Sequence, residues 1–371
     1  MSRERIKECK RWVVKVGSAL LTEGDADLNI AFINNLAEQI AFLSKQGIEV
    51  LLVSSGSVAA GVNQLGMDKR PDTISELQAA AAVGQASLIR QYEQAFKPYA
   101  MTLAQILLTH ADIANRERYL NARSALTTLI DLGVLTVINE NDTVATDEIC
   151  FGDNDNLAAL VVNLVDADLL VILTDQDGLF TTDPRTDVDA ELLSEVSAND
   201  DSLITMASGG STVGRGGMVT KLTAAQTASR SGADTIIANG SEANIIQRLY
   251  KGEDFGTLFK ADERLASRKQ WMAGQLKICG KITIDQGAVQ VLKESGKSLL
   301  PVGISKTEGS FKRGELVSCV DQSGNEIARG LSNYNADEAK KIVGQASDQI
   351  IEILGYGSNT EFIHRDNLVL V

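Results

Sequence analysis

The sequence has few of the residues that build metal sites and disulfide frameworks. It contains two histidines, His110 and His364, and four scattered cysteines, with no C-x-x-C pair among them. This scarcity argues against a zinc site and against a disulfide scaffold. No run of about 18 apolar residues occurs, so no membrane span is expected. The N-terminus is charged and Lys15 interrupts its short apolar run, which argues against a signal peptide. We therefore expect a protein of the reducing cytoplasm.

Positive charge is also scarce. The chain of 371 residues carries 35 Lys and Arg against 49 Asp and Glu, which gives a net charge of −14. Such a field repels phosphate surfaces and argues against a general binder of nucleic acids or membranes. With only four prolines and no long polar tract, the chain is expected to be globular. Its length predicts two domains, or one large and one small.

Two common nucleotide-binding signatures are missing as well. The pattern G-x-G-x-x-G does not occur, which argues against a dinucleotide-dependent dehydrogenase. The stretch SGKS at 295–298 looks like the end of a P-loop, but Val291 stands where that loop requires its first glycine. Any phosphate site must therefore use a different arrangement.

Short apolar runs alternate with helix-like segments over the first 260 residues. The runs are apolar throughout, as expected for strands that are covered on both faces. This alternation predicts an α/β fold with a mostly parallel sheet. The expected strands are 11–17, 48–57, 133–142, 168–178 and 233–241, and the expected helices include 30–47, 117–133 and 216–232.

The character of the sequence changes near residue 260. A charged, linker-like segment is followed by closely spaced strand candidates at 280–285, 298–304, 314–321 and 326–334, and then by a helix at 336–355. We expect a first domain at 1–260, a linker at 261–275 and a small β-rich domain at 276–371. The last of these holds 11 basic and 12 acidic residues, a net charge of −1, so the acidic excess belongs to the rest of the chain.

The ends of the predicted strands carry the candidate functional residues, because ligands of a parallel sheet bind beyond the carboxyl ends of its strands. Lys15 lies in an apolar run two residues before Gly17, where a lysine needs an anionic partner. The alternative is a lysine on an edge strand that reaches solvent. The turn at 54–56, Ser-Ser-Gly, can present backbone N–H groups to an anion, or serve as an ordinary turn.

Six acids gather within residues 139–156 with no Lys or Arg among them. Helix capping accounts for one or two of these carboxylates. The others require a bound cation, a nearby lysine or an ammonium group. The six are Glu140, Asp142, Asp147, Glu148, Asp153 and Asp155.

Two further segments carry candidate functional residues. Thr174 and Asp175 end an apolar strand, although an ordinary polar loop fits them equally well. At 214–222, three glycines lead into a helix that carries Lys221. Glycine lets the backbone approach a phosphate, and a helix N-terminus favours its charge. Lysines, glycine turns and carboxylates at strand ends together favour phosphoryl transfer.

The order of these segments resembles the amino acid kinase family. The matching stretches are VVKVGSALL, VSSGSVAAG, RERYLNAR, VINENDTVATDEICFGDNDNLAAL, LLVILTDQDGLFTTDPR and GGMVTKL, and the tail GEL…IARGLSNYNADEAKKIVG resembles a PUA domain. NEND followed by GDNDN is the most specific of them. The resemblance implies an αβα sandwich with a mostly parallel sheet. It also implies transfer of the γ-phosphoryl group of ATP to the γ-carboxylate of L-glutamate, the first step toward proline.

The resemblance also implies roles for single residues. Lys15 and Lys221 would stabilise the transferring phosphoryl group, and Asp155 would orient both lysines. Ser55, Asp142 and Asn154 would hold glutamate, with an acid facing its α-ammonium group. Magnesium would be carried by the ATP phosphates rather than by a protein metal site. The nucleotide would be contacted by Lys15, Thr174, Asp175, Arg215, Gly216, Gly217, Met218, Val219, Thr220 and Lys221.

Several partners follow from the same resemblance. Proline is the implied feedback inhibitor, at a site overlapping that of glutamate, and a homodimer or homotetramer is the implied assembly. Glutamate-5-semialdehyde dehydrogenase is the implied partner enzyme. A PUA domain implies RNA binding, but a net charge of −1 leaves no basic footprint, and a packing or regulatory module is the alternative. Glu140, Asp147 and Glu148 are expected to act in loop mobility or inhibitor sensing rather than in chemistry.

Two other functions are compatible with parts of the pattern. Another amino acid kinase could act on acetylglutamate, aspartate or uridylate, although the acidic cluster favours an acceptor that bears an amine. An RNA-binding regulator with an inactive kinase core is the second. The intact set of Lys15, Asp155 and Lys221 argues against it.

Overall fold

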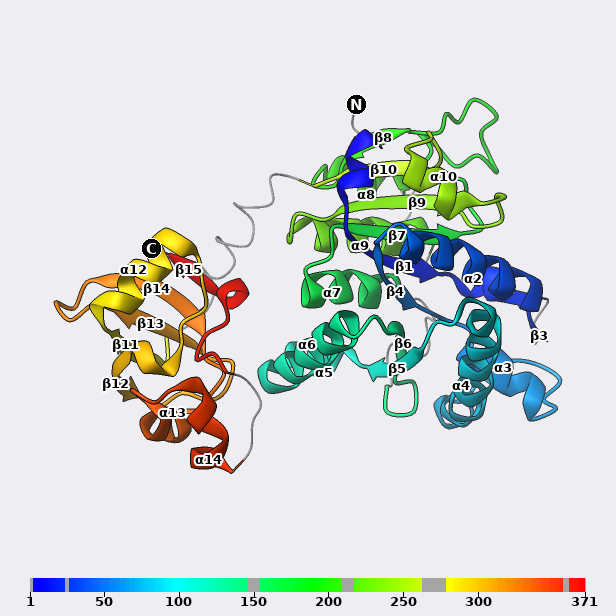
Figure 1. The fold of residues 1–371 in the computed structure, drawn as a ribbon. Coiled ribbons are helices and arrows are strands. Elements are labelled where there is room, and N and C mark those ends of the chain that lie inside the picture. The colour runs from blue at the N-terminus through cyan, green and yellow to red at the C-terminus, as the bar shows by residue number, and fades with distance from the viewer. Residues whose placement is uncertain are drawn as a thin grey trace. The chain divides into compact units, whose positions relative to one another are not determined.

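The chain folds into two compact units, described here separately (Figure 1). The computed structural model describes residues 3–23, 27–145, 154–207, 217–261, 278–355 and 360–370. The N-terminal unit takes most of residues 1–264 and contains an eight-stranded sheet, and the C-terminal unit takes most of 265–371 and contains a five-stranded sheet. The predicted fold class, a mostly parallel α/β sheet with an added β-rich domain, is confirmed. The exact domain limits stay a prediction.

The large sheet is mostly parallel. Its strands are β1 (Arg11–Val16), β4 (Glu49–Val53), β5 (Leu103–Leu108), β6 (Leu135–Glu140), β7 (Leu169–Thr174), β8 (Glu195–Ser197), β9 (Asp234–Asn239) and β10 (Thr257–Lys260). Their order is β5-β6-β4-β1-β7-β9-β10-β8, with parallel pairing from β5 to β9 and an antiparallel pair between β9 and β10. A separate ribbon joins β2 (Thr22–Glu23) and β3 (Asp27–Leu28).

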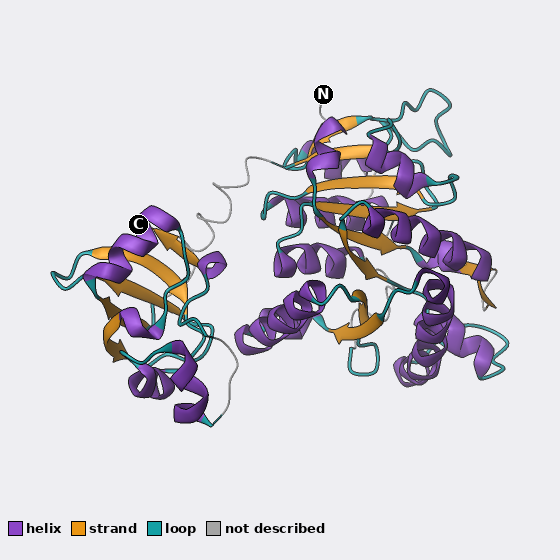
Figure 2. Cartoon of the chain, viewed as in Figure 1, coloured by secondary structure: helices purple, strands orange, loops and turns teal. Residues whose placement is uncertain are grey.

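Helices cover both faces of this sheet, as Figure 2 shows. They are η1 (Arg3–Glu8), α1 (Ser18–Leu21), α2 (Ile30–Lys45), α3 (Ser57–Gln64), α4 (Ile74–Phe96), η2 (Lys97–Tyr99), α5 (His110–Ala114), α6 (Arg116–Asp131), α7 (Asp155–Val165), α8 (Ser202–Ala207), α9 (Met218–Ser229) and α10 (Ile245–Lys251). In the ranges given above, no helix is both long and apolar enough to cross a lipid bilayer.

The alternation of side chains along β1 decides where Lys15 lies. Trp12, Val14 and Val16 are buried in the main core together with residues of α2, α4 and α10. Successive side chains of a strand point to opposite faces. Lys15 therefore faces the other side of the sheet, where α7 packs on β1. Because β1 is paired on both sides and Lys15 is 3% exposed, the alternative of a solvent-reaching lysine on an edge strand is wrong.

Helix α4 packs unusually closely against α3 and the turn that precedes it. A Cβ atom built on Gly61 of α3 would lie 1.7 Å from the carbonyl oxygen of Ala80, and one on Gly84 of α4 would lie 1.8 Å from that of Ser57. Only glycine allows two backbones to approach this closely. The two glycines therefore bring the long helix α4 directly onto α3, which begins immediately after the turn that follows β4.

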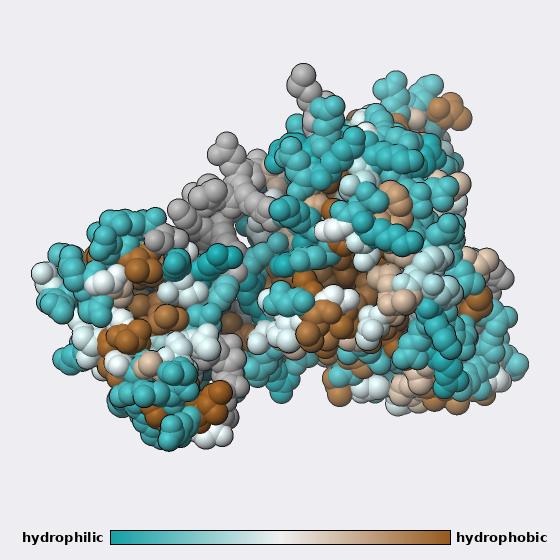
Figure 3. Space-filling view, viewed as in Figure 1, coloured by the Kyte–Doolittle hydropathy of each residue, from teal (hydrophilic) through white to brown (hydrophobic). Residues whose placement is uncertain are grey.

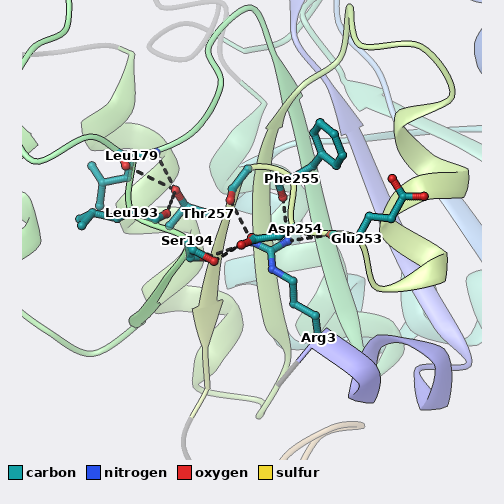
Figure 4. A network of polar contacts seen from close by, with 9 residues as sticks. Arg3, Leu179, Leu193, Ser194, Glu253, Asp254, Phe255 and Thr257 are labelled. Carbon is teal, nitrogen blue, oxygen red and sulfur yellow. Dashed lines mark hydrogen bonds and ion pairs between the residues drawn. The ribbon is translucent and has the colours of Figure 1, made fainter. Parts of the chain in front are cut away.

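A buried arginine anchors the segment between β7 and β8, residues 175–194 (Figure 4). The guanidinium group of Arg3 donates hydrogen bonds to the carbonyl oxygens of Ser194, Phe255 and Gly256. Thr257 Oγ1 accepts from the amide of Leu179 and donates to the carbonyl oxygen of Leu193. These contacts tie both ends of the excursion between β7 and β8 to the segment around the start of β10.

The C-terminal unit is built on a smaller sheet of order β12-β11-β13-β14-β15. In each of the two units, hydrophilic residues cover most of the surface that Figure 3 shows, with smaller apolar patches among them. The strands are β11 (Gly280–Ile284), β12 (Ile304–Gly309), β13 (Leu316–Val320), β14 (Glu326–Leu331) and β15 (Leu368–Leu370). The helices are α12 (Gln286–Ser295), η4 (Pro301–Gly303), α13 (Ala336–Ile342), η5 (Ser347–Gln349), α14 (Ile350–Leu354) and η6 (Arg365–Asn367).

Two expected elements of this unit are wrong. The strand expected at 298–304 contains a 3₁₀ turn at Pro301–Gly303, and β12 begins only at Ile304. Proline fixes φ and lacks an N–H group, which prevents a regular strand there. The helix expected at 336–355 is interrupted after α13, where Gly344 adopts a φ of 75°. A left-handed glycine ends a helix rather than continuing it.

Candidate active site

Two buried lysines share one buried carboxylate at the carboxyl ends of β1 and β7. Lys15 Nζ lies 2.6 Å from Asp155 Oδ1, and Lys221 Nζ lies 3.0 Å from Asp155 Oδ2. Asp155 is 0% exposed and Lys221 is 6% exposed. The three side chains come from β1, α7 and α9, and together carry one positive charge in excess. Buried charges require partners, so this trio suits a further anion.

The backbone beside the trio leaves room for such an anion. A Cβ atom built on Gly17 would lie 4.0 Å from Lys15 Nζ and 3.4 Å from the carbonyl oxygen of Leu173. A side chain at this position would therefore fill space next to the ammonium group. Glycine keeps that space open for a ligand.

The N-terminus of α9 lies at the same place. Gly217, with a φ of 74°, is the residue before the helix, and its carbonyl oxygen accepts from Thr220 Oγ1 and from Lys221 Nζ. Thr220 Oγ1 also lies within hydrogen-bond distance of Asp155 Oδ2, at 3.0 Å. Met218 and Val219 are half-buried in the first turn. The remaining predicted nucleotide contacts, Arg215 and Gly216, lie outside the described residues.

Asn154 joins the ends of β4 and β6 to α7. It stands at the N-cap of α7, but its side chain makes no capping hydrogen bond. Instead, its Nδ2 donates to the carbonyl oxygen of Ser54 at 2.5 Å and to Asn139 Oδ1 at 2.7 Å. The Asn154 side chain thus makes contacts across the sheet instead of a capping hydrogen bond. The hydroxyl of Ser55 is buried and has no hydrogen-bond partner in the described part of the chain.

Asp142 lies close to the same turn. Its Oδ2 accepts a hydrogen bond of 2.8 Å from Ser57 Oγ at the start of α3. Burial raises the pKa of the Asp142 carboxyl group, while the Ser57 hydrogen bond and the charge of Arg70 oppose that rise. A cation bound beside Asp142 would favour its charged form. Asp142 is therefore suited to an ammonium group.

The other acids of the 139–156 cluster separate into two groups. Glu140 is buried at the end of β6, and its backbone N–H donates to Asn139 Oδ1. Asp147, Glu148 and Asp153 lie outside the described residues. The expected roles of these four acids in loop mobility, inhibitor sensing or helix capping stay predictions.

A second polar group marks the ends of β7 and β9. Thr174 Oγ1 donates to Asp175 Oδ1 at 3.0 Å, and Asn239 Nδ2 donates to Asp177 Oδ1 at 2.8 Å. These strands are parallel neighbours, and β1 lies on the other side of β7. The structure therefore places Thr174 and Asp175 on the side of the trio opposite to Ser55, Asn154 and Asp142.

Sequence reasoning assigned no role to three side chains of this region. Asn139 accepts from Asn154, Gln85 accepts from Asn139 at 2.7 Å, and Tyr92 Oη lies 2.9 Å from Ser54 Oγ. Gln85 and Asn139 are 54 positions apart in the chain. No local pattern marks such pairs. The seven-residue spacing of Gln85 and Tyr92, which places both on one face of a helix, is the one signal that could have grouped them.

The C-terminal unit contains a cavity of about 620 Å³ that offers a different environment. Apolar residues of α12 and of the following segment form much of its wall, among them Leu292 and Leu299. The titratable residues that line it are all partly or largely exposed. No buried charge there resembles the trio in the sheet. The candidate active site is therefore the trio and its neighbours in the N-terminal unit.

Comparisons with known proteins agree with this division of the chain. Residues 10–239 match the model of the amino acid kinase family, and residues 280–354 match that of the PUA domain. Among curated relatives, the glutamate 5-kinase of Hahella chejuensis is 56% identical over 372 residues, which cover 100% of this chain and 96% of that protein. The glutamate 5-kinase of Nitrosococcus oceani is 57% identical over 371 residues, which cover 100% of this chain and 99% of that protein.

A solved structure shares the fold of the N-terminal unit. The carbamate kinase of Giardia lamblia bound to AMP-PNP superposes with a TM-score of 0.50 at 21% identity. The match covers 69% of this chain and 100% of that one.

Proposed function

The chain belongs to the amino acid kinase family, and from that premise we propose that it transfers the γ-phosphoryl group of ATP to the γ-carboxylate of L-glutamate. The product is L-glutamyl 5-phosphate, and the reaction is the first step of proline biosynthesis. The observation that carries the proposal is the buried carboxylate of Asp155 with a lysine on each oxygen, flanked by polar strand ends on both sides.

The trio offsets negative charge during transfer. One γ-carboxylate oxygen attacks the γ-phosphorus of ATP, the bond from that phosphorus to the β,γ-bridging oxygen breaks, and ADP leaves. Lys15 and Lys221 face the transferring group with fixed positive charges, and Asp155 holds both ammonium groups in place. Positioned charges of this kind are the main source of catalysis in phosphoryl transfer. The acceptor carboxylate is already ionised at neutral pH and needs no general base.

The two sides of the trio divide the substrates between them. Thr174, Asp175 and the first turn of α9 are assigned to the nucleotide, because helix N-termini favour phosphate. Ser55, Asp142 and Asn154 are assigned to glutamate. Within the described ranges, no group of three or more metal-ligating side chains gathers. We assign magnesium to the ATP phosphates, as part of the nucleotide substrate.

The remaining partners are proposals that follow from the family. Proline is proposed to inhibit by binding where glutamate binds, and it should raise the apparent KM for glutamate. A homodimer or homotetramer, glutamate-5-semialdehyde dehydrogenase as a partner enzyme, and RNA binding by the PUA domain stay predictions. Cytoplasmic localisation stays a prediction as well.

Trapping of the acyl phosphate tests the proposed function. Purified protein incubated with MgATP, glutamate and hydroxylamine should form γ-glutamyl hydroxamate and release ADP in equal amounts. Aspartate, acetylglutamate and uridylate are the matched alternative acceptors. Turnover of one of these without turnover of glutamate would overturn the assignment.

Replacing Asp142 with asparagine should weaken glutamate binding with little effect on turnover. We expect the KM for glutamate to rise about tenfold or more, because a charge-assisted contact to the α-ammonium group is lost. Kinetics with varied glutamate at saturating ATP measure the change. Asp131→Asn, at an exposed position that ends α6, is the matched control. An unchanged KM in the Asp142 variant would remove the α-ammonium assignment.

The raised pKa of Asp142 gives this contact a pH dependence. Only the ionised carboxylate pairs with the ammonium group, and burial shifts ionisation to higher pH than for an ordinary aspartate. The wild-type KM for glutamate should therefore rise as the pH falls through that raised pKa. The Asp142→Asn variant should lack this part of the pH profile.

A further inference from the structure

Helix α4 borders the proposed glutamate site at two points. Gly84 lies against the backbone of Ser57, and the Tyr92 hydroxyl lies 2.9 Å from Ser54 Oγ. The first contact is made to the residue that begins α3, and the second to the turn that contains Ser55. Gln85 lies between these two points on the helix and contacts Asn139 at the end of β6. Gln85 is thus linked through Asn139 to Asn154, which is assigned to the substrate.

The orientation of the Gln85 amide is fixed by a backbone group. The N–H of Glu140 donates to Asn139 Oδ1 at 3.0 Å, and a backbone N–H can only donate. The Nδ2 of Asn139 must then face Gln85, where it donates to Oε1 at 2.7 Å. The Nε2 of Gln85 consequently points away from Asn139. It is buried and has no hydrogen-bond partner among the residues that the structure describes.

A buried amide donor without a partner is costly, and such groups are normally satisfied in native proteins. The Ser55 hydroxyl, in the turn that α4 packs upon, is in the same situation. Two unsatisfied donors beside the proposed glutamate site favour a ligand that accepts hydrogen bonds. A carboxylate, with two oxygens and only acceptor capacity, satisfies both.

The order of the strands indicates which carboxylate this is. Lys15 lies on β1, Ser55 follows β4, and Asn139 is the last residue but one of β6. Strand β4 lies between β1 and β6. Adjacent strands are about 4.8 Å apart, so the span from β1 toward β6 is comparable with the length of a glutamate molecule. With the γ-carboxylate at the trio, the α-carbon lies toward β6, where Asp142 is assigned to the ammonium group.

We propose that Gln85 Nε2, together with Ser55 Oγ, donates to the α-carboxylate of the bound acceptor. Gln85 then selects amino acids with a free α-carboxylate, and the rigid chain from Glu140 through Asn139 sets the direction of its donor. This inference rests on the proposed function, because it takes glutamate as the acceptor.

The proposal is tested by placing a carboxylate at position 85 of the protein and an amide at the α-position of the ligand. Gln85→Glu keeps an oxygen for Asn139 but replaces the donor with a carboxylate, which repels the α-carboxylate of glutamate. The probe is isoglutamine, the α-amide of glutamate, whose amide can donate to the new carboxylate. We expect the preference for glutamate over isoglutamine, in Kd by calorimetry and in kcat/KM, to fall about 10- to 100-fold. Gln94→Glu, exposed on the same helix, is the control of equal charge.

The outcomes separate the possible failures. If a folded Gln85→Glu variant keeps the wild-type preference for glutamate over isoglutamine, even with both ligands bound more weakly, Gln85 has a structural role and the proposal is overturned. If that variant does not fold, Gln85→Leu, which removes the donor without adding charge, must still reduce the preference. If wild-type protein binds glutamate but forms no hydroxamate, the proposed function is overturned. The ratio of the Kd values for glutamate and isoglutamine then tests the role of Gln85 by itself. Wild-type protein that does not bind glutamate overturns both.

Discussion

Replacing Lys221 with methionine should lower kcat by about 10²- to 10³-fold while the KM for glutamate changes little. The ammonium group of Lys221 lies at the N-terminus of α9 with Gly217 and Thr220, on the carboxylate that it shares with Lys15. Its charge acts on the phosphoryl group mainly during transfer, so its loss appears in turnover rather than in acceptor binding. Initial rates of hydroxamate formation at varied glutamate measure both constants.

The fold should tolerate this substitution. Asp155 keeps its contact of 2.6 Å with Lys15, so no buried charge is left alone. Lys45→Met, at an exposed position that ends α2, is the matched control and should leave both constants unchanged. A Lys221→Met enzyme with a normal kcat and a raised KM for glutamate would contradict a role in the transition state.

Replacing Asp155 with asparagine should have the largest effect on stability. Two buried ammonium groups would then face a neutral amide, and removal of one partner from a buried ion pair costs about 3–5 kcal/mol. We expect the free energy of unfolding to fall by about that amount, measured by denaturant titration with fluorescence and circular dichroism. Hydroxamate formation should fall at the same time, because the lysines lose the group that orients them.

The control for this variant is another aspartate with a basic partner. Asp183 pairs with Arg185 on the surface, at 2.8 Å, and both side chains are more than two-fifths exposed. Solvent screens such pairs, so Asp183→Asn should leave the denaturation midpoint essentially unchanged. Equal stability of the Asp155→Asn and wild-type proteins would show that the buried lysines do not depend on this carboxylate.

The class of fold could be predicted because it depends on local pattern. Apolar runs of five or six residues between amphipathic segments predict covered parallel strands, and β6 and β7 are indeed buried along their whole length. Elements with a mixed pattern were harder to predict. The sequence pattern does not distinguish one C-terminal helix from two, because a glycine such as Gly344 can lie within a helix or end it.

The residues of the candidate site could be predicted only in part. Lysine in an apolar run and acids after a strand are unusual for their surroundings, and so Lys15, Asp142 and Asp155 attract attention in the sequence alone. Gln85 and Tyr92 do not, since polar residues are ordinary on a helix. Their importance depends on Gly84, whose missing side chain lets α4 approach the start of α3 at Ser57.

The sequence by itself determined which chemical groups this protein has at its strand ends, and the family to which the chain belongs. The tertiary structure decided how those groups are paired. Lys15 and Lys221 meet on Asp155 because β1, α7 and α9 pack together, although the three residues are far apart in the chain. Likewise, the backbone N–H of Glu140 orients two amides and leaves the Gln85 donor facing away from Asn139. Such pairings depend on the strand order and on helix packing, which local sequence patterns do not encode.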